Sequence, residues 1–368
     1  MGLTPDAVKA LVRDGWEVVV ARGAGAGSHF TDAAYEAAGA TLADEPRGDL
    51  TVRVNPPTLE EVAQLPEGSA HLSFLSPLLS QDVVRALNER RVTTLSFDLL
   101  PRISRAQYMD ALSSQATVSG YRSVLAAATA FDRFFPLLTT AAGTIRPAKV
   151  LVMGVGVAGL QAIATAKRLG AKVRAYDVRS AAKEEAESAG ATFVQLGITA
   201  DAAGGYARAL SAEETAAQQQ ALLQEVANAD IVITTAAVPG RRAPILVTTA
   251  MVEAMGEGSL VVDMAADGGG NCELTVAGEV VTHGGVRVVG LANPPAAMGA
   301  HASFLYANNV LKLLALFGAK GQWAPDWSDE VVLGVTVAHD GSIVHGPTAE
   351  ALGVAAVVPT TPPTKEND

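Results

Sequence analysis

The segment 149–179, KVLVMGVGVAGLQAIATAKRLGAKVRAYDVR, restricts the fold more than any other part of the chain. An apolar run leads directly into Gly154, Gly156 and Gly159, spaced G-x-G-x-x-G, and a helical pattern follows. The first glycine permits a tight turn, the second lets the backbone approach a pyrophosphate, and the third allows the helix to pack closely. The N-terminus of the helix adds free N–H groups that favour an anion. The segment therefore predicts a strand-turn-helix unit that binds a dinucleotide.

Asp177 ends the second strand of this unit, and Arg179 follows it closely. A carboxylate at this place accepts hydrogen bonds from the hydroxyls of the adenosine ribose. It would also repel a 2′-phosphate, so the pattern favours NAD over NADP. Arg179 leaves NADP open as the less favoured cofactor, because an arginine near this position can accommodate a phosphate.

Apolar runs alternate with helical or turn segments throughout the middle of the chain. The expected strands are 148–154, 172–178, 230–236, 258–265, 278–284 and 286–290, and an alanine-rich helix is expected over 114–132. Such alternation predicts a parallel, doubly wound sheet. We therefore expect a Rossmann-like domain over 114–302 that holds the nucleotide.

The two ends of the chain carry a second set of alternating elements. Strands are expected at 16–21, 50–54, 70–75 and 92–97, helices at 5–14, 31–39 with Thr31 as N-cap, 80–91 and 301–318, and a hairpin at 331–346. This set predicts a first Rossmann-like domain over 1–113 plus 303–358, with its N-terminal strand missing, and a disordered tail at 359–368. The predicted fold class is α/β, with two doubly wound domains and a cleft between them.

Composition excludes several classes of function. The net charge of −11 argues against a nucleic-acid partner, which requires a concentrated cationic face. Charged residues make up only 18%, which suggests that an interface covers part of the surface. Cys272 is the only cysteine, so an intramolecular disulfide is impossible and a reducing, cytoplasmic location is the default. The uncharged run 288–311 contains NPP, HAS and NN, so we interpret it as loop plus buried helix rather than a membrane span.

Candidates for proton transfer and for metal binding are weak. The histidines that could serve by residue type are His71, His283, His301, His339 and His345, and a structural role is favoured for each. No spacing typical of metal ligands is visible, so no metal is expected. The strand end at 233–240 and the glycine turn at 263–273 could contact a nucleotide or merely turn the chain.

The segment 100–115, LPRISRAQYMDALSSQ, carries a polar face. Counted along a helix from Gln107, the side chains of Asp110, Ser113 and Ser114 fall on one side, and two arginines precede them. Such a face suits a carboxamide and ribose hydroxyls, because Gln and Ser side chains both donate and accept hydrogen bonds. The alternative is a solvated polar face.

Several motifs together resemble one family. PRISRAQYMDALSSQ, the segment 139–179, AGGYARAL, ITTAAVPGRRAPIL and GGNC resemble the NAD(H)-binding component, domain I or alpha-1 type, of proton-translocating nicotinamide nucleotide transhydrogenase. This component is similar in fold to alanine dehydrogenase. The resemblance covers nearly the whole chain and implies two domains with NAD(H) in the cleft.

The resemblance also implies a set of site residues. The nicotinamide side would be lined by Arg102, Arg105, Gln107, Asp110 and Ser113, of which Arg102, Gln107, Asp110 and Ser113 are the expected catalytic set. The pyrophosphate would lie at Val155, Gly156 and Val157, beside Gly154 and Gly159, and the adenosine at Asp177, Val178 and Arg179. Tyr206 matches the tyrosine of a mobile loop in the family, and Gly205, Gln218 and Ala237 match other nucleotide contacts.

The reaction that the resemblance implies is hydride transfer between NAD(H) on this chain and NADP(H) on a partner subunit, coupled to proton translocation by a membrane-embedded subunit. Transfer between two nicotinamide rings requires no acid or base from the protein, only apposition and exclusion of water. The chain would be a homodimer with no nucleic-acid partner. It would be cytoplasmic, without direct membrane insertion, and peripheral on the inner face of the cell membrane through its partner subunits.

The sequence departs from the family pattern in three places. Alanine dehydrogenases carry a lysine and a histidine where this chain has Asn55 and Ser76, which argues against that enzyme. NPPAAMG, beginning at Asn293, replaces the usual pattern, so contacts there are open. The alternatives are a soluble NAD-dependent oxidoreductase like alanine dehydrogenase, and an NAD-binding partner protein without catalytic activity.

Overall fold

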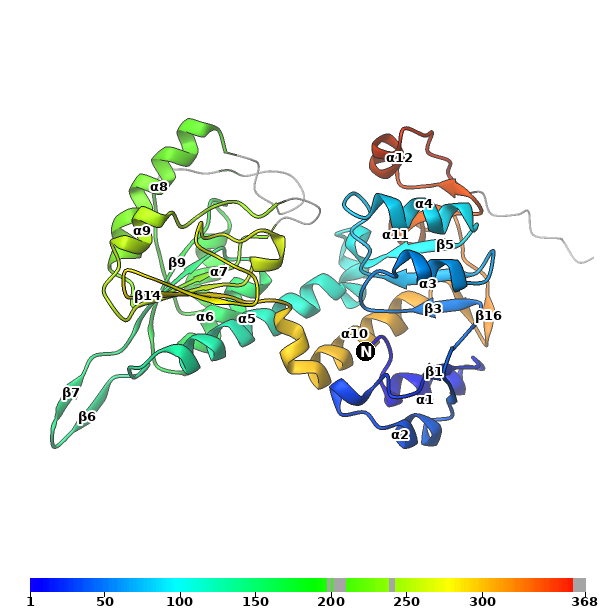
Figure 1. Ribbon diagram of the computed structural model, residues 1–368, viewed down its shortest axis with the longest axis horizontal. Coiled ribbons are helices and arrows are strands. Elements are labelled where there is room, and N and C mark those ends of the chain that lie inside the picture. Colours follow the sequence, from blue (N-terminus) through cyan, green and yellow to red (C-terminus); the bar gives the residue numbers. More distant parts are fainter. Residues whose placement is uncertain (197–199, 201–209, 238–241, 360–368) are drawn as a thin grey trace, which may run out of the picture. The chain divides into compact units, whose positions relative to one another are not determined.

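The computed structural model describes residues 1–196, 200, 210–237 and 242–359 (Figure 1). The chain divides into two compact units. The terminal unit comprises Met1–Gln115 and the chain from Gly299 onward, and the central unit comprises Ala116–Met298. The predicted disordered tail, 359–368, lies outside the described part of the chain except for residue 359.

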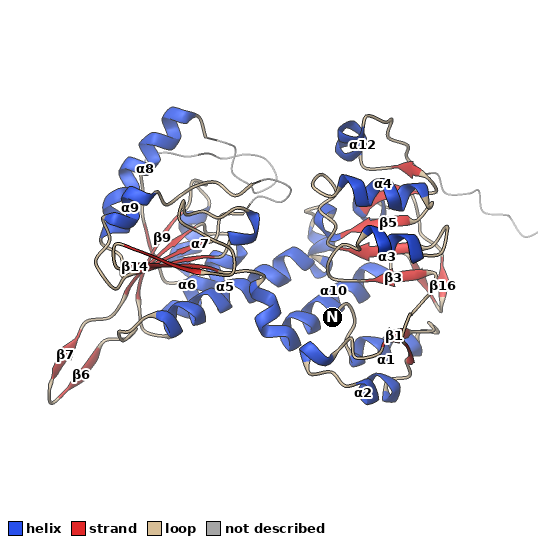
Figure 2. Ribbon diagram, in the orientation of Figure 1, coloured by secondary structure: helices blue, strands red, loops and turns tan. Residues whose placement is uncertain are grey.

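The central unit is built on a seven-stranded sheet with the order β10-β9-β8-β11-β12-β14-β13 (Figure 2). Its strands are β8 (Lys149–Met153), β9 (Lys172–Tyr176), β10 (Thr192–Phe193), β11 (Ile231–Thr234), β12 (Leu260–Asp263), β13 (Val280–His283) and β14 (Val286–Gly290). All neighbours are parallel except β13 and β14, which form an antiparallel pair. The predicted Rossmann-like sheet is confirmed.

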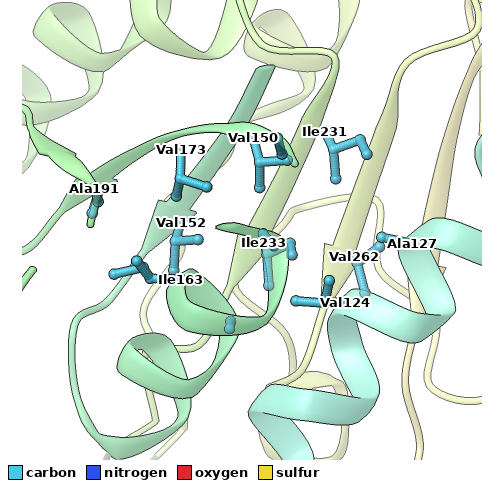
Figure 3. Close-up of a cluster of buried hydrophobic side chains, with 14 of the residues drawn as sticks. Val124, Ala127, Val150, Val152, Ile163, Val173, Ala191, Ile231, Ile233 and Val262 are labelled. Carbon is cyan, nitrogen blue, oxygen red and sulfur yellow. The ribbon is translucent and has the colours of Figure 1, made fainter. Parts of the chain in front are cut away.

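Helices cover the sheet and bury both of its faces. They are α5 (Ala111–Ala130), which begins in the terminal unit, α6 (Val157–Arg168), α7 (Ala182–Ser188), α8 (Ala212–Ala227) and α9 (Thr249–Glu253). In β8, Val150 and Val152 pack in one cluster, with Val124 of α5 and Ile163 of α6 (Figure 3). Leu151 and Met153 pack in a second cluster, with Leu222 of α8. A strand buried on both faces explains the unbroken apolar run in the sequence.

The terminal unit contains a five-stranded sheet with the order β18-β17-β5-β4-β3. The strands are β3 (Leu50–Val52), β4 (Ala70–Ser73), β5 (Thr93–Ser96), β17 (Thr336–His339) and β18 (Ser342–Ile343). The first three are parallel, whereas β17 is antiparallel to β5 and to β18. The sheet is therefore mixed, and β1 (Val19–Ala21) pairs outside it with β2 (Thr41–Ala43).

The helices of the terminal unit are α1 (Pro5–Arg13), α2 (Asp32–Ala37), α3 (Leu59–Gln64), α4 (Gln81–Glu89), α10 (Gly299–Leu314), α11 (Glu330–Val335) and α12 (Gly346–Leu352). Thr31 caps α2 as predicted, since its side chain accepts a hydrogen bond from Ala34 N. Tyr306 of α10 is buried against Phe97. Across the described residues, no helix is both long enough and apolar enough to span a membrane.

The predicted hairpin over 331–346 is wrong in its first half, where α11 stands. Asp329 caps this helix by accepting hydrogen bonds from the backbone N of Val331 and Val332. Val331, Val332 and Val335 are all buried in the core. These positions also satisfy a helical period, and the cap decides between helix and strand.

Candidate functional site

The carboxyl ends of three parallel strands meet at one edge of the central sheet. Met153 of β8, Thr234 of β11 and Asp263 of β12 are in register there. β9 lies on one side of β8 and β11 on the other, so the chain reverses its direction of winding between β8 and β11. Open α/β sheets bind their ligands at such a switch point. The turn after β8 is therefore the first candidate for a ligand site.

Two of the three glycines in this turn are required by their surroundings. Gly154 has a φ of +99°, and a Cβ there would lie 2.7 Å from Oγ1 of Thr235. A Cβ at Gly159 would lie only 1.9 Å from the carbonyl oxygen of Gly154, because α6 crosses the turn at contact distance. The tight turn and the close helix packing that the sequence predicts are both present.

Gly156 differs from its two neighbours. A Cβ there would meet no atom within 4 Å, so the backbone faces open space. Gly156 is also the N-cap of α6, and no side chain there caps the helix. The first N–H groups of the helix lack intrahelical acceptors, and the positive end of the helix dipole lies beside them. The geometry suits an anion in contact with the backbone at Gly156 and Val157.

The Asp177 carboxylate already has hydrogen-bond partners within the protein. Its carboxylate accepts hydrogen bonds from Val155 N at 2.7 Å and from Arg179 N at 2.9 Å. The Arg179 guanidinium donates two further bonds, through Nε at 3.0 Å and Nη2 at 2.8 Å. The Asp177 side chain thus closes the turn after β8, and a ribose hydroxyl would have to compete with Arg179 for it.

The remaining nucleotide positions implied by the resemblance fall in different environments. Val178 is half-buried against the second core cluster. Gln218 of α8 is buried and donates a hydrogen bond to the Tyr176 hydroxyl at 2.9 Å, which ties α8 to β9. Ala237 is exposed, just beyond the end of β11. Gly205 and Tyr206 lie outside the described residues, as does the end of the segment 233–240.

At this edge of the central sheet, three residues were not predicted individually from the sequence. Thr235 donates a hydrogen bond to the Gly154 carbonyl at 2.9 Å, and Asn271 hydrogen-bonds the backbone of Ala236. Asp263 is fully buried and holds the glycine turn 263–273 through hydrogen bonds to Asn271 N and Cys272 N. These bonds argue against a freely flexible turn. A carboxylate at the end of an apolar strand was the available signal.

In the terminal unit, the helix that we counted from Gln107 is interrupted. Ser104–Met109 form a 3-10 helix, η3, and α5 begins only at Ala111. Asp110 lies between them, and its carboxylate accepts hydrogen bonds from Ser113 N at 2.9 Å and Ser113 Oγ at 2.5 Å. The single-helix prediction is wrong because Asp110 competes for the backbone and caps α5. Asp110 and Ser113 are still brought together.

The two arginines before Asp110 are exposed, as is Gln107. Arg105 forms a two-pronged ion pair with Asp329, through Nη1 at 2.9 Å and Nη2 at 2.8 Å. This hydrogen bonding lowers the pKa of the Asp329 carboxyl. Arg105 therefore connects η3 to the N-terminus of α11, while Gln107 and Arg102 lie at the surface of the same segment.

The positions that separate this chain from alanine dehydrogenase also lie on loops. Ser76 follows β4 with a φ of +47°, and its N–H donates to Asp98 Oδ2 at 2.9 Å. Asn55 is exposed after β3. Asn293, where the sequence departs from the usual family pattern, has a φ of +42° and donates its N–H to Asp267 at 2.7 Å.

The five candidate histidines lie in different local environments. Burial lowers the pKa of His71 to about 4, with Arg53 contributing, and its Nε2 lies 3.0 Å from Ser73 Oγ. Burial also lowers the pKa of His339 and of His345. His283 pairs with Glu253, and His301 is exposed on α10. In the part of the chain that is described, no group of His, Cys, Asp and Glu side chains could hold a metal ion.

Comparison with known proteins identifies the family and the fold. The family models for the N-terminal and C-terminal domains of alanine dehydrogenase/PNT match residues 1–119 and 123–346. A Rhodospirillum rubrum protein, named as the first portion of NAD(P) transhydrogenase subunit alpha, is 45% identical over 361 residues, covering 94% of each chain. The alanine dehydrogenase of Halomonas elongata is 30% identical, covering 97% of this chain and 94% of its own. The crystal structure of transhydrogenase from Sinorhizobium meliloti has a TM-score of 0.84 and 42% identity, covering 93% of this chain and 95% of that chain.

The chain belongs to the alanine dehydrogenase/PNT family of α/β proteins. Within this family the resemblance to transhydrogenase is confirmed, because proteins named NAD(P) transhydrogenase subunit alpha match it at 43–45% identity over most of its length.

Proposed function

We propose that the central unit binds NAD(H) at the turn after β8, and that the chain exchanges hydride with NADP(H) held by a partner subunit. The observation that carries the proposal is the glycine turn, which is closed by contacts at Gly154 and Gly159 and open at Gly156. The pyrophosphate would lie against Val155, Gly156 and Val157. The adenosine would lie beside Asp177, once Arg179 has moved aside or taken up the ribose itself.

The nicotinamide half would be held by Arg102, Gln107, Asp110 and Ser113. Gln107 and Ser113 can both donate to and accept from the carboxamide. Because Asp110 already binds Ser113, its role would be to orient that hydroxyl. Arg105, through its ion pair with Asp329, would fix η3 in place.

Hydride transfer between two nicotinamide rings moves two electrons and one proton as a unit, so no protein group has to take up a proton. It requires that the rings face each other with water excluded. The environments of the histidines support this mechanism. In the central unit, His283 is occupied by Glu253 and is partly exposed.

A glycine substitution tests the cofactor site. In Gly156→Ala the added methyl meets no protein atom, so stability should stay unchanged, but the methyl would collide with a pyrophosphate. We expect at least a tenfold rise in the Kd for NADH, worth about 1.4 kcal/mol. Gly346→Ala, at an equally open position on α12, is the matched control. Unchanged NADH affinity in Gly156→Ala would refute the assigned site.

A reconstitution assay tests the reaction. The chain would be mixed with an NADP(H)-binding transhydrogenase component, and hydride transfer from NADPH to an acetylpyridine analogue of NAD would be followed by absorbance. Exchange that requires both proteins supports the proposal. Tight NADH binding with no exchange would favour an NAD-binding protein without catalytic activity.

Alanine oxidation is the second candidate, because the H. elongata relative at 30% identity is an alanine dehydrogenase. Asn55 and Ser76 argue against it, since neither side chain can replace a lysine that binds a carboxylate or a histidine that transfers a proton. We expect no NADH or pyruvate from alanine and NAD. Measurable pyruvate would overturn the transhydrogenase assignment.

We propose that the chain is a homodimer. The hairpin of β6 (Leu138–Thr140) and β7 (Gly143–Ile145) projects from the central unit (Figure 1). Phe134 and Leu137, which lead into it, are 53% and 61% exposed, and Ile145 is 41% exposed. Exposed apolar side chains of this size mark interaction surfaces. Sedimentation should show a dimer that Leu137→Glu and Ile145→Glu convert to monomer, whereas a monomeric wild type would contradict the proposal.

We further propose that a membrane-embedded subunit couples the transfer to proton translocation, and that this chain lies in the cytoplasm on the inner face of the cell membrane. The relatives named as subunits support this proposal. In cell fractionation the chain should sediment with membranes and be released by high salt or urea without detergent. A chain that stays in the soluble fraction when its partners are present would contradict it.

A further inference from the structure

The fully buried carboxylate of Asp263 holds the turn that follows β12 through hydrogen bonds. The donors to Oδ1 are Thr234 Oγ1 at 3.0 Å and Ala265 N at 2.9 Å, and those to Oδ2 are Asn271 N at 2.6 Å, Cys272 N at 3.0 Å and Thr275 Oγ1 at 2.6 Å. A buried charge is stable only when its acceptor positions are satisfied in this way. The network fixes the backbone at Asn271.

The side chain of Asn271, also fully buried, binds the loop after the neighbouring strand β11. Its Oδ1 accepts a hydrogen bond from Ala236 N at 3.0 Å, and its Nδ2 donates to Ala236 O at 2.8 Å. Nδ2 also donates to Pro244 O at 2.7 Å. The amide thus uses one acceptor and two donors at once, which no apolar or hydroxyl side chain can do, because a hydroxyl has only one donor.

The loop held by Asn271 in turn supports the glycine turn. Thr235, which precedes Ala236, donates its hydroxyl to Gly154 O at 2.9 Å. The Thr235 hydroxyl oxygen also lies close to the Cα of Gly154, since a Cβ on that residue would approach it to 2.7 Å. A displacement of the loop after β11 would therefore displace the turn after β8.

We propose that Asn271 is a positioning residue for nucleotide binding, which sets the glycine turn through Ala236 and Thr235 and is itself held by Asp263. The inference rests on the proposed NAD(H) site at Gly156. Asn271 is fully buried and its amide is occupied by backbone groups, so it acts through other residues. Asn271 raises the affinity for NADH by more than its contribution to folding stability would explain.

The test compares NADH affinity with thermal stability in Asn271→Ala. The matched control is Val150→Ala, which removes buried methyl groups at the opposite, amino end of β8 and touches none of these hydrogen bonds. NADH Kd is measured by fluorescence titration well below the Tm of each variant. We expect Kd to rise about tenfold in Asn271→Ala and less than twofold in Val150→Ala, for a similar loss of Tm.

A second pair of variants covers the case in which Asn271→Ala fails to fold. Thr235→Val keeps the shape of the side chain but removes the hydroxyl that reaches Gly154, whereas Thr235→Ser keeps the hydroxyl. We expect the Kd to rise about five- to tenfold in Thr235→Val, and to be largely restored in Thr235→Ser.

The outcomes separate the inference from the function on which it rests. If the wild type does not bind NADH, the proposed function fails. If the wild type binds, and the folded Asn271 and Thr235 variants bind as tightly as Val150→Ala, the positioning role is refuted and the network only stabilises the fold.

Discussion

In each unit, an aspartate at or just beyond the carboxyl end of a buried parallel strand accepts hydrogen bonds from nearby loops. The two aspartates differ in the backbone groups that they leave free for a ligand. In the central unit, Asp263 and Asn271 secure the neighbouring loop, and the N-terminus of α6 stays open at Gly156. In the terminal unit, Asp98 itself takes the backbone N–H groups of Leu75 at 2.7 Å and Ser76 at 2.9 Å after β4. Backbone groups that already bind a carboxylate are not available for a phosphate.

This difference explains why only one of two similar α/β units is proposed to hold the pyrophosphate. An anion site requires free N–H groups and space beside them. The central unit provides both, because a glycine stands where a Cβ would meet only open space. In the terminal unit the N–H groups of Leu75 and Ser76 after β4 are already bound to Asp98, and the unit instead presents the polar segment around Gln107 and Asp110.

The largest expected effect comes from closing the glycine turn. In Gly159→Ala the Cβ would overlap the Gly154 carbonyl, so α6 must move away from β8. We expect a loss of about 3 kcal/mol in the free energy of unfolding, together with loss of NADH binding. Thermal and urea unfolding measure the first, and fluorescence titration the second. Wild-type stability in this variant would show that the turn tolerates a side chain.

A loss of stability of comparable size should appear at acidic pH, and it should arise in the terminal unit. His71 has a folded pKa of about 4, whereas the unfolded value is 6.5, so the unfolded state binds the extra proton between these pH values. This contribution to stability is complete above pH 6.5 and is lost as the pH falls toward 4, by about 3 kcal/mol.

The measurement is urea unfolding between about pH 7 and pH 4, compared with His71→Gln. Glutamine can still bind Ser73 but does not titrate in this range, so its stability should depend less on pH. Equal pH dependence in both proteins would mean that other groups cause the acid effect.

A smaller effect is expected at the surface of the terminal unit. Arg105→Ala removes the ion pair with Asp329, which is partly exposed, so the free energy of unfolding should fall only slightly. The larger consequence should be on transfer rate, because η3 would no longer be tied to α11. If kcat drops while the Kd for NADH stays within about twofold, Arg105 positions η3 and does not contact NADH. If the Kd rises by the same factor as kcat falls, Arg105 is a direct affinity contact.

The smallest expected effect is a gain in stability. Ser76→Gly removes the cost of a φ of +47° after β4 but increases the entropy of the unfolded chain, so stability should rise by less than about 1 kcal/mol. NADH affinity should not change, because the N–H of residue 76 still binds Asp98. Gained phosphate binding in this variant would contradict the contrast between the two units.

Much of the fold could be predicted because its signals are local. Six of the seven strands of the central sheet, the cap of α2 by Thr31 and the spacing of Gly154, Gly156 and Gly159 all depend on neighbouring residues, whereas β10 was not predicted. The predictions failed where two local patterns competed. Val331–Val335 fits a strand as well as a helix until Asp329 caps it, and Gln107–Ser113 fits one helix until Asp110 binds Ser113.

The sequence alone determined the class of fold, the place of the candidate anion site and the family resemblance, since these rest on glycine spacing and on apolar periodicity. Only the tertiary structure decided that Asp177 binds the backbone N of Val155, that Gln218 is buried against Tyr176, and that Asn271 binds Ala236. These contacts depend on which strands and helices become neighbours in the fold. Hydrogen bonds between distant segments leave no periodic trace in a sequence, because each requires only one suitable side chain at one place.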